Sequence, residues 1–165
     1  MIAEYGLRQT PRELMDGVNA VMEDFYLRRI PLKPGVRELL DALDARGVPM
    51  AVASVTDRRL VEAALKRHGV ADRFRALVTT NEAGVGKQEP AVYLLAAERI
   101  GSAPGETLVF EDALHALLTA KRAGFRTVGV FDADNLKHQE TLAAEAEFYL
   151  RDFSDCSAIL AAVDR

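Results

Sequence analysis

The sequence of 165 residues lacks the features that mark several common classes of protein. It has no tryptophan and a single cysteine, Cys156, which excludes an internal disulfide and fits a reducing compartment. The longest uncharged apolar run, around residues 48–53, is far shorter than the roughly 20 residues that a membrane-spanning helix needs. Glu4 and Arg8 interrupt the N-terminal segment, where a secretory signal is apolar. We therefore expect a cytoplasmic protein with no membrane partner.

The sequence also has no large excess of positive or negative charge. The 21 basic and 25 acidic residues give a net charge of −4 and a pI near 5.4, and the basic residues occur in scattered pairs. Because nucleic-acid binding generally needs a basic patch or stripe, we expect no nucleic acid as a partner. Apolar residues make up 49% of the chain, and it has no internal repeat or long linker. The composition is that of one globular domain with a small appendage at most.

Two amphipathic helices are predicted in the N-terminal part of the chain. Residues 10–13 carry a capping-box signature, and apolar residues then recur at helical spacing as far as Arg29. Residues 31–35 are typical of a turn, and the second helix follows until Gly47, a residue that favours the left-handed end of a helix. Gly6 resembles a helix C-cap, but too few residues precede it for a stable helix, so we expect the chain to begin within an element.

From residue 48 onward, short apolar runs alternate with amphipathic helices. The predicted strands cover residues 50–53, 76–78, 107–110, 127–131 and 148–150. The predicted helices cover residues 58–68, 90–100, 113–123 and 137–146. Near-continuous apolar strands separated by helices predict an α/β fold with a parallel sheet covered on both faces. Because ligands bind at the carboxyl ends of such strands, functional residues are expected just after each strand.

Polar residues follow three of these predicted strands. Ser54 follows the first, Lys87 lies in the loop after the second, and Glu111 and Asp112 follow the third. Hydroxyl and ammonium groups can hold phosphoryl oxygens, and adjacent carboxylates can hold Mg²⁺. Each residue also has an ordinary structural interpretation: Ser54 as a helix N-cap, Lys87 as a solvated loop lysine, and the acids as favourable charges at a helix N-terminus. Their order along the chain favours phosphate chemistry.

These segments resemble the motifs of the haloacid dehalogenase (HAD) superfamily of phosphohydrolases, in the subgroup of β-phosphoglucomutase-like phosphatases. The resemblance extends from residues 34–40 to the region of residues 152–153. Residues 51–54 are similar to the second motif of the family, residues 86–90 to its third, and residues 108–113 to its fourth.

The resemblance implies a role for each residue at the predicted strand ends. It implies that Lys87 and Ser54 are catalytic, that Ser54, Val55 and Lys87 bind the substrate phosphate, and that Glu111 and Asp112 hold Mg²⁺. The implied substrate is a small phosphorylated metabolite.

The first motif of the family is not found before Ser54. In the family, an aspartate in an Asp-x-Asp-x-Thr segment attacks phosphate from the end of a central strand. The resemblance therefore implies an HAD-like Rossmannoid core at residues 31–165 that lacks its first, central strand. It also implies a remnant of a helical cap domain at residues 1–30. The incomplete sheet predicts poor stability, a rearranged sheet that closes the gap, or self-association.

A second Asp-x-Asp sequence, at Asp132 and Asp134, follows the predicted strand at residues 127–131. Leu136 stands where the family motif has threonine, so we expect a capping or turn role rather than a permuted nucleophile. Other charged residues have ordinary structural interpretations. Arg58 and Arg59 are expected on a solvated helix face. Residues 66–68 are expected to complement a helix C-terminus, and His115 is expected at the surface.

The resemblance implies a Mg²⁺-dependent phosphatase that acts through an aspartyl-phosphate intermediate in the complete protein. This chain is expected to be inactive without the nucleophile. The alternative is a non-catalytic phosphate-binding or interaction module. A receiver-like domain is a third interpretation, but its acidic pocket is absent from the sequence.

Overall fold

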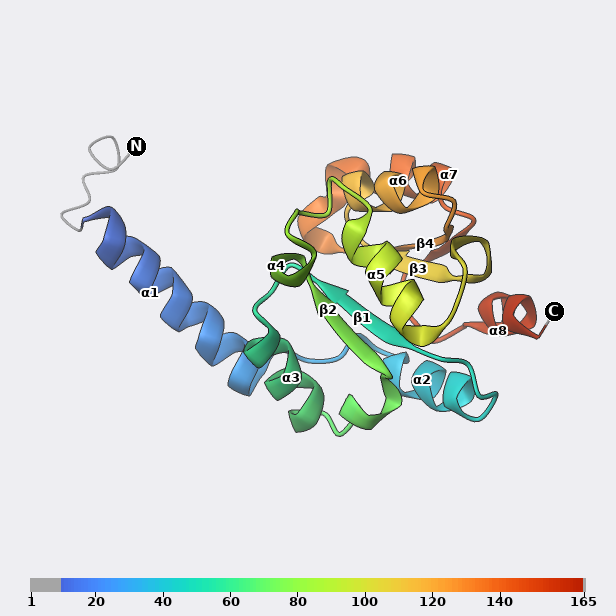
Figure 1. Cartoon of the computed structure of the whole chain (residues 1–165), viewed down its shortest axis with the longest axis horizontal. Helices are drawn as coiled ribbons and strands as arrows, with labels where there is room; N and C mark the ends of the chain where they lie inside the picture. Colours follow the sequence, from blue (N-terminus) through green and yellow to red (C-terminus); the bar gives the residue numbers. More distant parts are fainter. Residues whose placement is uncertain (1–9, 165) are drawn as a thin grey trace.

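The computed structural model describes residues 10–164 (Figure 1). The α-helices are α1 (Pro11–Asp24), α2 (Val36–Asp44), α3 (Arg58–Arg67), α4 (Thr80–Ala83), α5 (Ala91–Ile100), α6 (Leu114–Arg122), α7 (Gln139–Glu145) and α8 (Ser157–Val163). A π-helix, η1 (Phe25–Arg29), and three 3₁₀ segments, η2 (Ala71–Arg73), η3 (Pro104–Glu106) and η4 (Ala133–His138), complete the helical elements of this part of the chain. No helix in the described range is long and apolar enough to cross a membrane. The helix end predicted at Gly6 lies outside the described residues.

The strands confirm the predicted parallel α/β architecture, but they form two separate sheets. They are β1 (Ala51–Ser54), β2 (Ala76–Thr79), β3 (Leu108–Glu111), β4 (Arg126–Val130) and β5 (Phe148–Leu150). One sheet has the order β1-β2 and the other β3-β4-β5, and every pairing is parallel. Within residues 10–164 no strand joins β1 to β3, so the expectation that a rearranged sheet closes the gap is wrong.

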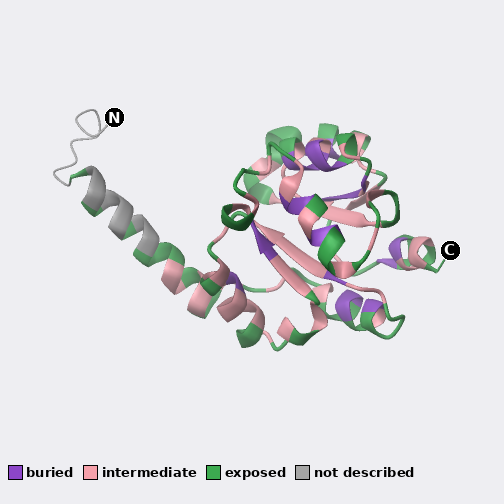
Figure 2. Ribbon diagram, viewed as in Figure 1, coloured by how far each residue is buried: buried purple, intermediate pink, exposed green. Residues whose placement is uncertain are grey.

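Two apolar clusters pack on opposite faces of the strands, one built on α2 and α8 and the other on α5. Figure 2 shows buried residues in each of these helices. Leu108 and Phe110 of β3 pack toward the cluster of α2 and α8, whereas Val109 between them packs toward the cluster of α5. This alternation follows from the pleat, which points successive side chains to opposite faces. Each buried leucine or isoleucine in these clusters contributes about 1.5–3 kcal/mol relative to an exposed one.

The first predicted helix is confirmed and extends as α1 and η1 to Arg29. Its capping box is present: the Glu13 backbone N–H donates to the Thr10 Oγ1 atom at 3.3 Å, and the Thr10 N–H donates to Glu13 Oε2 at 2.7 Å. Figure 1 shows α1 standing clear of the sheets, with its C-terminal end beside α3. Val21, near that end, leaves 69% of its surface exposed.

Contacts from α3 and the loop before it hold the end of this helix. Arg59 donates to Glu23 at 2.8 Å, and the hydroxyls of Tyr26 and Thr56 lie 3.0 Å apart. The His68 ring lies 2.8 Å from the carbonyl oxygen of Ile30, which also accepts from the neighbouring arginine of α3. The basic residues at the end of α3 therefore hold the segment after α1, in addition to their predicted favourable interaction with the helix dipole of α3.

The predicted turn at residues 31–35 is confirmed, and it packs tightly against the C-terminal part of the chain. Gly35 has φ +79°, and a Cβ there would lie 2.2 Å from the backbone carbonyl of Phe153. The Phe153 N–H donates to the Pro34 oxygen at 3.0 Å. Lys33 donates to the Phe131 oxygen at 2.9 Å and to Asp132 Oδ2 at 2.8 Å. The turn is thus bound to the carboxyl end of β4.

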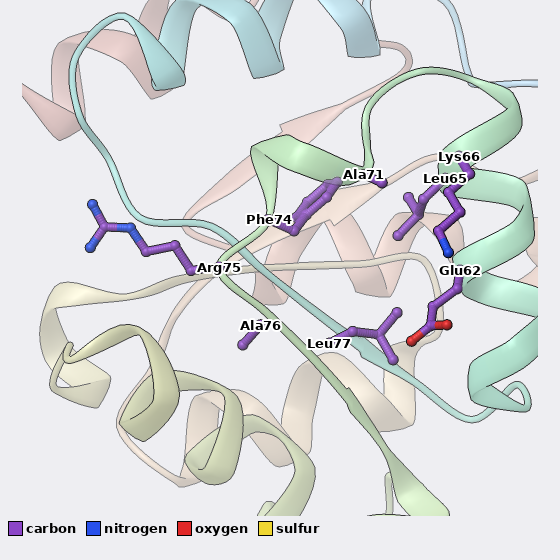
Figure 3. A pocket seen from close by; sticks show the side chains of 8 residues that line it. All are labelled: Glu62, Leu65, Lys66, Ala71, Phe74, Arg75, Ala76 and Leu77. Atoms are coloured by element: carbon purple, nitrogen blue, oxygen red, sulfur yellow. The ribbon is translucent and has the colours of Figure 1, made fainter.

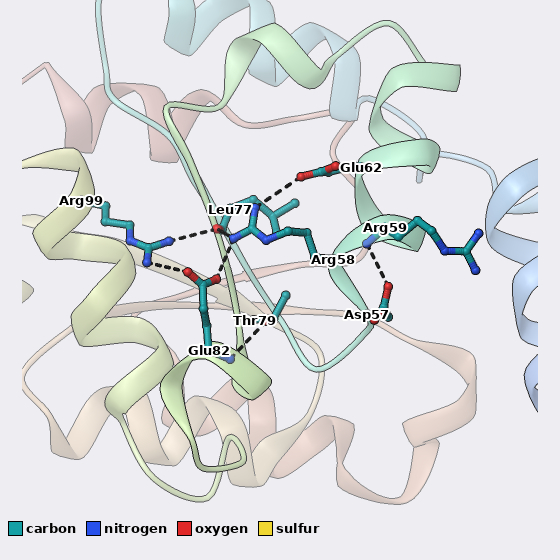
Figure 4. A network of polar contacts seen from close by, with 8 residues as sticks. All are labelled: Asp57, Arg58, Arg59, Glu62, Leu77, Thr79, Glu82 and Arg99. Atoms are coloured by element: carbon teal, nitrogen blue, oxygen red, sulfur yellow. Dashed lines mark hydrogen bonds and ion pairs between the residues drawn. The ribbon is translucent and has the colours of Figure 1, made fainter.

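The outer edge of β2 is capped by arginines (Figure 4). Arg58 donates to the Leu77 oxygen at 2.6 Å and to Glu82 at 2.6 Å, while Arg99 donates to the other oxygen of Glu82 at 2.6 Å. The hydrogen bonds from Arg99 and Arg58 lower the pKa of Glu82 to about 2. The predicted solvated role of Arg58 is therefore incomplete, because this side chain also shields a strand edge.

Candidate functional site

The predicted functional residues lie at the carboxyl ends of the strands. Ser54 ends β1 opposite Thr79 at the end of β2, and Glu111 ends β3 opposite Gly129 of β4. The Ser54 hydroxyl accepts from the Thr56 N–H at 3.0 Å. The N-cap of α3 is Asp57, so the interpretation of Ser54 as that cap is wrong.

The centre of the site is an ion pair between the half-buried Lys87 and the buried Glu111. Lys87 comes from the loop between α4 and α5, and its side chain is 17% exposed, whereas that of Glu111 is 7% exposed. The interpretation of Lys87 as a solvated loop lysine is therefore wrong. A carboxylate buried at the end of a strand needs such a partner, since an isolated buried charge is costly.

Tyr93 is part of this site, and the motif comparison did not single it out. Its hydroxyl donates to Glu111 Oε1 at 2.8 Å, and the Lys87 ammonium lies 5.5 Å from the centre of its ring. Burial raises the pKa of Tyr93, and the charges of Glu111 and Asp112 raise it further. The phenol therefore stays protonated and acts as a donor. The signal in the sequence is a tyrosine on a buried helix face, where its hydroxyl needs a polar partner.

Asp112 and Val55 follow the strand ends without a direct polar link to the ion pair. Asp112 is half-buried, and its backbone oxygen accepts from Asn135 at 3.5 Å. Both acids precede Ala113, the N-cap of α6, and neither side chain caps that helix. Val55 is 62% exposed. Among the described residues, no hydrogen bond connects Ser54 with the carboxylates or the lysine.

The carboxylates at the end of β3 fit Mg²⁺ better than a metal ion whose ligands all come from the protein. In residues 10–164 no three His, Cys, Asp or Glu side chains gather around one point. Mg²⁺ is usually held by one or two carboxylates, with water and substrate phosphate completing its octahedron. Glu111 and Asp112 provide such carboxylates, and Oε2 of Glu111 is the oxygen that Lys87 and Tyr93 leave uncontacted.

The second Asp-x-Asp sequence has the predicted capping role. Asp132 is the N-cap of η4, and its Oδ1 accepts from the Asp134 N–H at 3.0 Å. Its Oδ2 accepts from Lys33. The hydrogen bonds from Lys33 and from the Asp134 backbone lower the pKa of Asp132. His115 is exposed, as expected.

Of two hollows near the strands in the described part of the chain, the larger reaches the site. A groove of about 670 Å³ between the two sheets is lined at one end by Tyr93 and Glu111. A pocket of about 260 Å³ between α3 and the amino end of β2 is lined by charged and apolar side chains, including Glu62, Lys66 and Phe74 (Figure 3). The smaller pocket is at the opposite end of β2 from the predicted functional residues.

Comparisons with known proteins identify relatives of this chain. The plasmid CbbY protein of Cupriavidus necator is 34% identical over 125 residues, which are 71% of this chain and 49% of the relative. Validoxylamine A 7′-phosphate phosphatase of Streptomyces hygroscopicus subsp. limoneus is 33% identical over 121 residues, covering 73% of this chain and 55% of that protein. The chain spans about half the length of the curated relatives it matches.

Solved structures and a family model agree with these relatives. The structure of CbbY from Rhodobacter sphaeroides in complex with phosphate has a TM-score of 0.78 and 26% sequence identity, covering 94% of this chain and 71% of that one. The model of haloacid dehalogenase-like hydrolases matches residues 4–124. The motifs around Ser54, Lys87 and Glu111 fall within this match. The chain therefore belongs to the haloacid dehalogenase-like hydrolase family.

Proposed function

We propose that the complete protein is a Mg²⁺-dependent phosphatase of small phosphorylated metabolites that works through an aspartyl-phosphate intermediate. The observation that carries the proposal is the Lys87–Glu111 pair at the carboxyl end of β3, beside Asp112. A cation and adjacent carboxylates that can hold a metal ion are groups that stabilise charge in phosphoryl transfer. The relatives named phosphatases support the same class of reaction.

Each site residue has a proposed role. The Ser54 hydroxyl and the Lys87 ammonium hold phosphoryl oxygens, with Val55 beside them, and Glu111 and Asp112 hold Mg²⁺. The metal, when bound, neutralises charge on the phosphate. When phosphate binds, the Lys87 ammonium shares its hydrogen bonds between Glu111 and a phosphoryl oxygen. The Tyr93 hydroxyl keeps Glu111 in place.

The proposed organisation is a helical cap remnant at residues 1–30 and a core at residues 31–165. The buried free thiol of Cys156 supports a reducing compartment, and we propose the cytoplasm. A relative from Thermotoga maritima is named a phosphorylated carbohydrates phosphatase, which supports a small phosphate ester as the substrate.

A non-catalytic phosphate-binding module is the second candidate. It is favoured by one observation: among the described residues, no third carboxylate accompanies Glu111 and Asp112 in the site. Without a nucleophile such a site retains binding but loses most of the rate enhancement.

The experiment compares turnover with binding. The purified chain is expected to give no Mg²⁺-dependent hydrolysis of p-nitrophenyl phosphate. The complete protein is expected to give turnover that Lys87→Ala abolishes, whereas His115→Ala, at an exposed position, leaves it unchanged. Turnover by the chain alone, lost in Lys87→Ala, would show that the nucleophile is within it. An inactive complete protein that binds phosphate by calorimetry would support the module instead.

A further inference from the structure

Asp112 lies in a break between two regular elements. Glu111, just before it, is the last residue of β3 that pairs with β4, and Ala113, just after it, is the N-cap of α6. The Asp112 peptide is therefore outside both the strand and the helix. Among the described residues, its backbone oxygen accepts a hydrogen bond from Asn135, whose Nδ2 lies 3.5 Å away. Asn135 is thus the side chain that can fix the backbone at Asp112.

Asn135 ends a turn that follows β4. The Asn135 N–H donates to the Asp132 oxygen at 3.1 Å, which closes the turn at residues 132–135. The backbone at Asn135 has φ −112° and ψ 24°, which interrupts the helical conformation of η4. This part of conformational space is sparsely populated, and residues stay in it where surrounding contacts hold them. We therefore looked for the contacts that hold the turn at residues 132–135.

Gln139 of α7 holds this turn with its whole carboxamide. Its Nε2 donates to the Asp132 oxygen and to the Asn135 oxygen, each at 3.3 Å, so one side chain bridges the two ends of the turn. Its Oε1 accepts from the Tyr149 hydroxyl of β5 at 2.8 Å. Both N–H groups face acceptors and the oxygen faces a donor, which fixes the orientation of the amide.

Burial makes Gln139 the main support of the turn at residues 132–135. Gln139 is 9% exposed, whereas Lys33, which contacts the same turn through Asp132, has a side chain that is 41% exposed. Hydrogen bonds that are shielded from water are stronger, and leaving their buried partners unpaired is costly. Water can replace the Lys33 contact, but it has little access to the carbonyl oxygens that Gln139 bridges.

We propose that Gln139 is a positioning residue for the Asp112 carboxylate and that it acts through Asn135. Gln139 fixes the turn, the turn presents the Asn135 amide to the Asp112 oxygen, and the Asp112 backbone then directs its side chain. Groups that orient a metal ligand from behind typically change metal affinity by about 10–100-fold. The inference rests on the proposed function, in which Asp112 holds Mg²⁺, although the contacts themselves are measured without a metal.

The first measurement follows the contact between Asn135 and Asp112 by NMR of the ¹³C,¹⁵N-labelled full chain without metal. The carbonyl ¹³C resonance of Asp112 reports the hydrogen bond to its oxygen. We expect Asn135→Ala to move this resonance upfield, and Gln139→Leu to move it in the same direction. The control is Leu136→Ala, in the same segment at a side chain that is 65% exposed, and it is expected to leave the resonance unchanged.

The second measurement is the affinity of the chain for Mn²⁺, which takes the same oxygen ligands as Mg²⁺ and is counted by electron paramagnetic resonance. We expect Asn135→Ala and Gln139→Leu each to weaken Mn²⁺ binding about tenfold. The double variant is expected to lose about tenfold as well, rather than about a hundredfold, because the two residues act along one path. Tyr149→Phe keeps both Nε2 donors and is expected to leave the affinity nearly unchanged.

Three outcomes overturn the proposal. An Asp112 carbonyl resonance that does not move in Gln139→Leu would show that the turn does not transmit the change. Losses that multiply in the double variant would show that the two residues act separately. An equal loss in Tyr149→Phe would show a general loosening of α7. If Gln139→Leu fails to fold, Gln139→Glu takes its place, because it keeps the oxygen that Tyr149 contacts and removes the donors.

Asp112→Asn separates this inference from the proposed function. This variant is expected to lose Mn²⁺ binding. Equal binding by Asp112→Asn, or no binding by the unaltered chain, would contradict the metal-holding role of Asp112. The Asp112 carbonyl resonance would still decide whether Gln139 acts on Asp112 through Asn135.

Discussion

The Tyr93 hydroxyl donates to Glu111 Oε1 at 2.8 Å, and the Lys87 ammonium contacts the same oxygen. One carboxylate oxygen thus receives a donor from α5 and another from the loop before it. This arrangement fixes the Glu111 carboxylate and leaves its second oxygen uncontacted by either donor. The three side chains therefore act as a unit, and a change in one alters the other two.

Tyr93→Phe is expected to lower the free energy of unfolding by about 2 kcal/mol, because a hydrogen bond to a buried charged group is lost. The control is Tyr149→Phe, which removes a hydroxyl bond of the same 2.8 Å length to the neutral Gln139, and about 1 kcal/mol is expected there. Urea denaturation measures both. Equal losses, or a Tyr93→Phe effect that persists in a Glu111→Gln background, would show that the carboxylate is not responsible.

Gly35→Ala is expected to destabilise the protein by about 3 kcal/mol or more, because its Cβ would clash with backbone that has no room to move. The control is Gly47→Ala, which has a similar positive φ of +67° and no atom within 4 Å of the added Cβ. Only the left-handed backbone penalty, about 1–2 kcal/mol, applies to it. Thermal and urea unfolding of the two variants separate close packing from backbone strain. Similar losses would contradict the tight contact with Phe153.

The Glu82 network predicts a pH dependence of stability. Arg99 and Arg58 lower the folded-state pKa of Glu82 from 4.5 to about 2, so the unfolded chain binds the proton more tightly. The stabilising contribution is therefore present above about pH 4.5 and is lost as the pH falls toward 2. Glu82→Gln is expected to lower the urea midpoint at about pH 6 and to have a smaller effect at about pH 3.5.

Glu62→Gln is the control for this prediction, since within residues 10–164 Glu62 forms an ion pair with Arg58 and with no second arginine, at 3.3 Å. An effect of Glu82→Gln that is equal at both pH values would show that the carboxylate charge is not what stabilises the edge of β2.

Asp132 is expected to resist phosphorylation. Its two carboxylate oxygens accept from Lys33 and from the Asp134 N–H, so neither is placed to attack a phosphoryl group. Incubation with acetyl phosphate and Mg²⁺, followed by borohydride trapping and peptide mass spectrometry, is expected to show no label at Asp132. Label at this residue, lost in Asp132→Asn, would identify it as a nucleophile.

Periodicity and cap residues predicted most elements correctly because they report local conformation. The strand predicted at residues 148–150 has those bounds, and the helix predicted at 58–68 ends one residue earlier. The helix predicted at 137–146 is divided into η4 and α7, since the Asp132 cap starts a 3₁₀ turn first. α8 was not predicted, because its short apolar segment has neither a side-chain cap nor a polar face.

The positions of the predicted site residues at strand ends could be read from the sequence, but their contacts could not. Ser54, Lys87 and Glu111 follow strands, and that position is visible in the sequence. The pairing of Lys87 with Glu111 depends on how the loop after β2 lies over β3, which the sequence pattern does not report. The Arg58–Glu82–Arg99 network likewise joins three elements through side chains that look solvated in any local window.

The buried thiol of Cys156 can report local unfolding of the protein. The thiol is 9% exposed, packs with Ile159 in the cluster of α2 and α8, and donates to the Phe153 oxygen at 3.4 Å. Burial raises the pKa of this thiol, and the nearby carboxylates of Asp155 and Asp152 raise it further. A thiol reagent therefore modifies it only when this side of the sheet loosens. Because the chain has a single cysteine, the rate of thiol labelling measures how often the cluster of α2 and α8, on one side of the groove, unfolds locally.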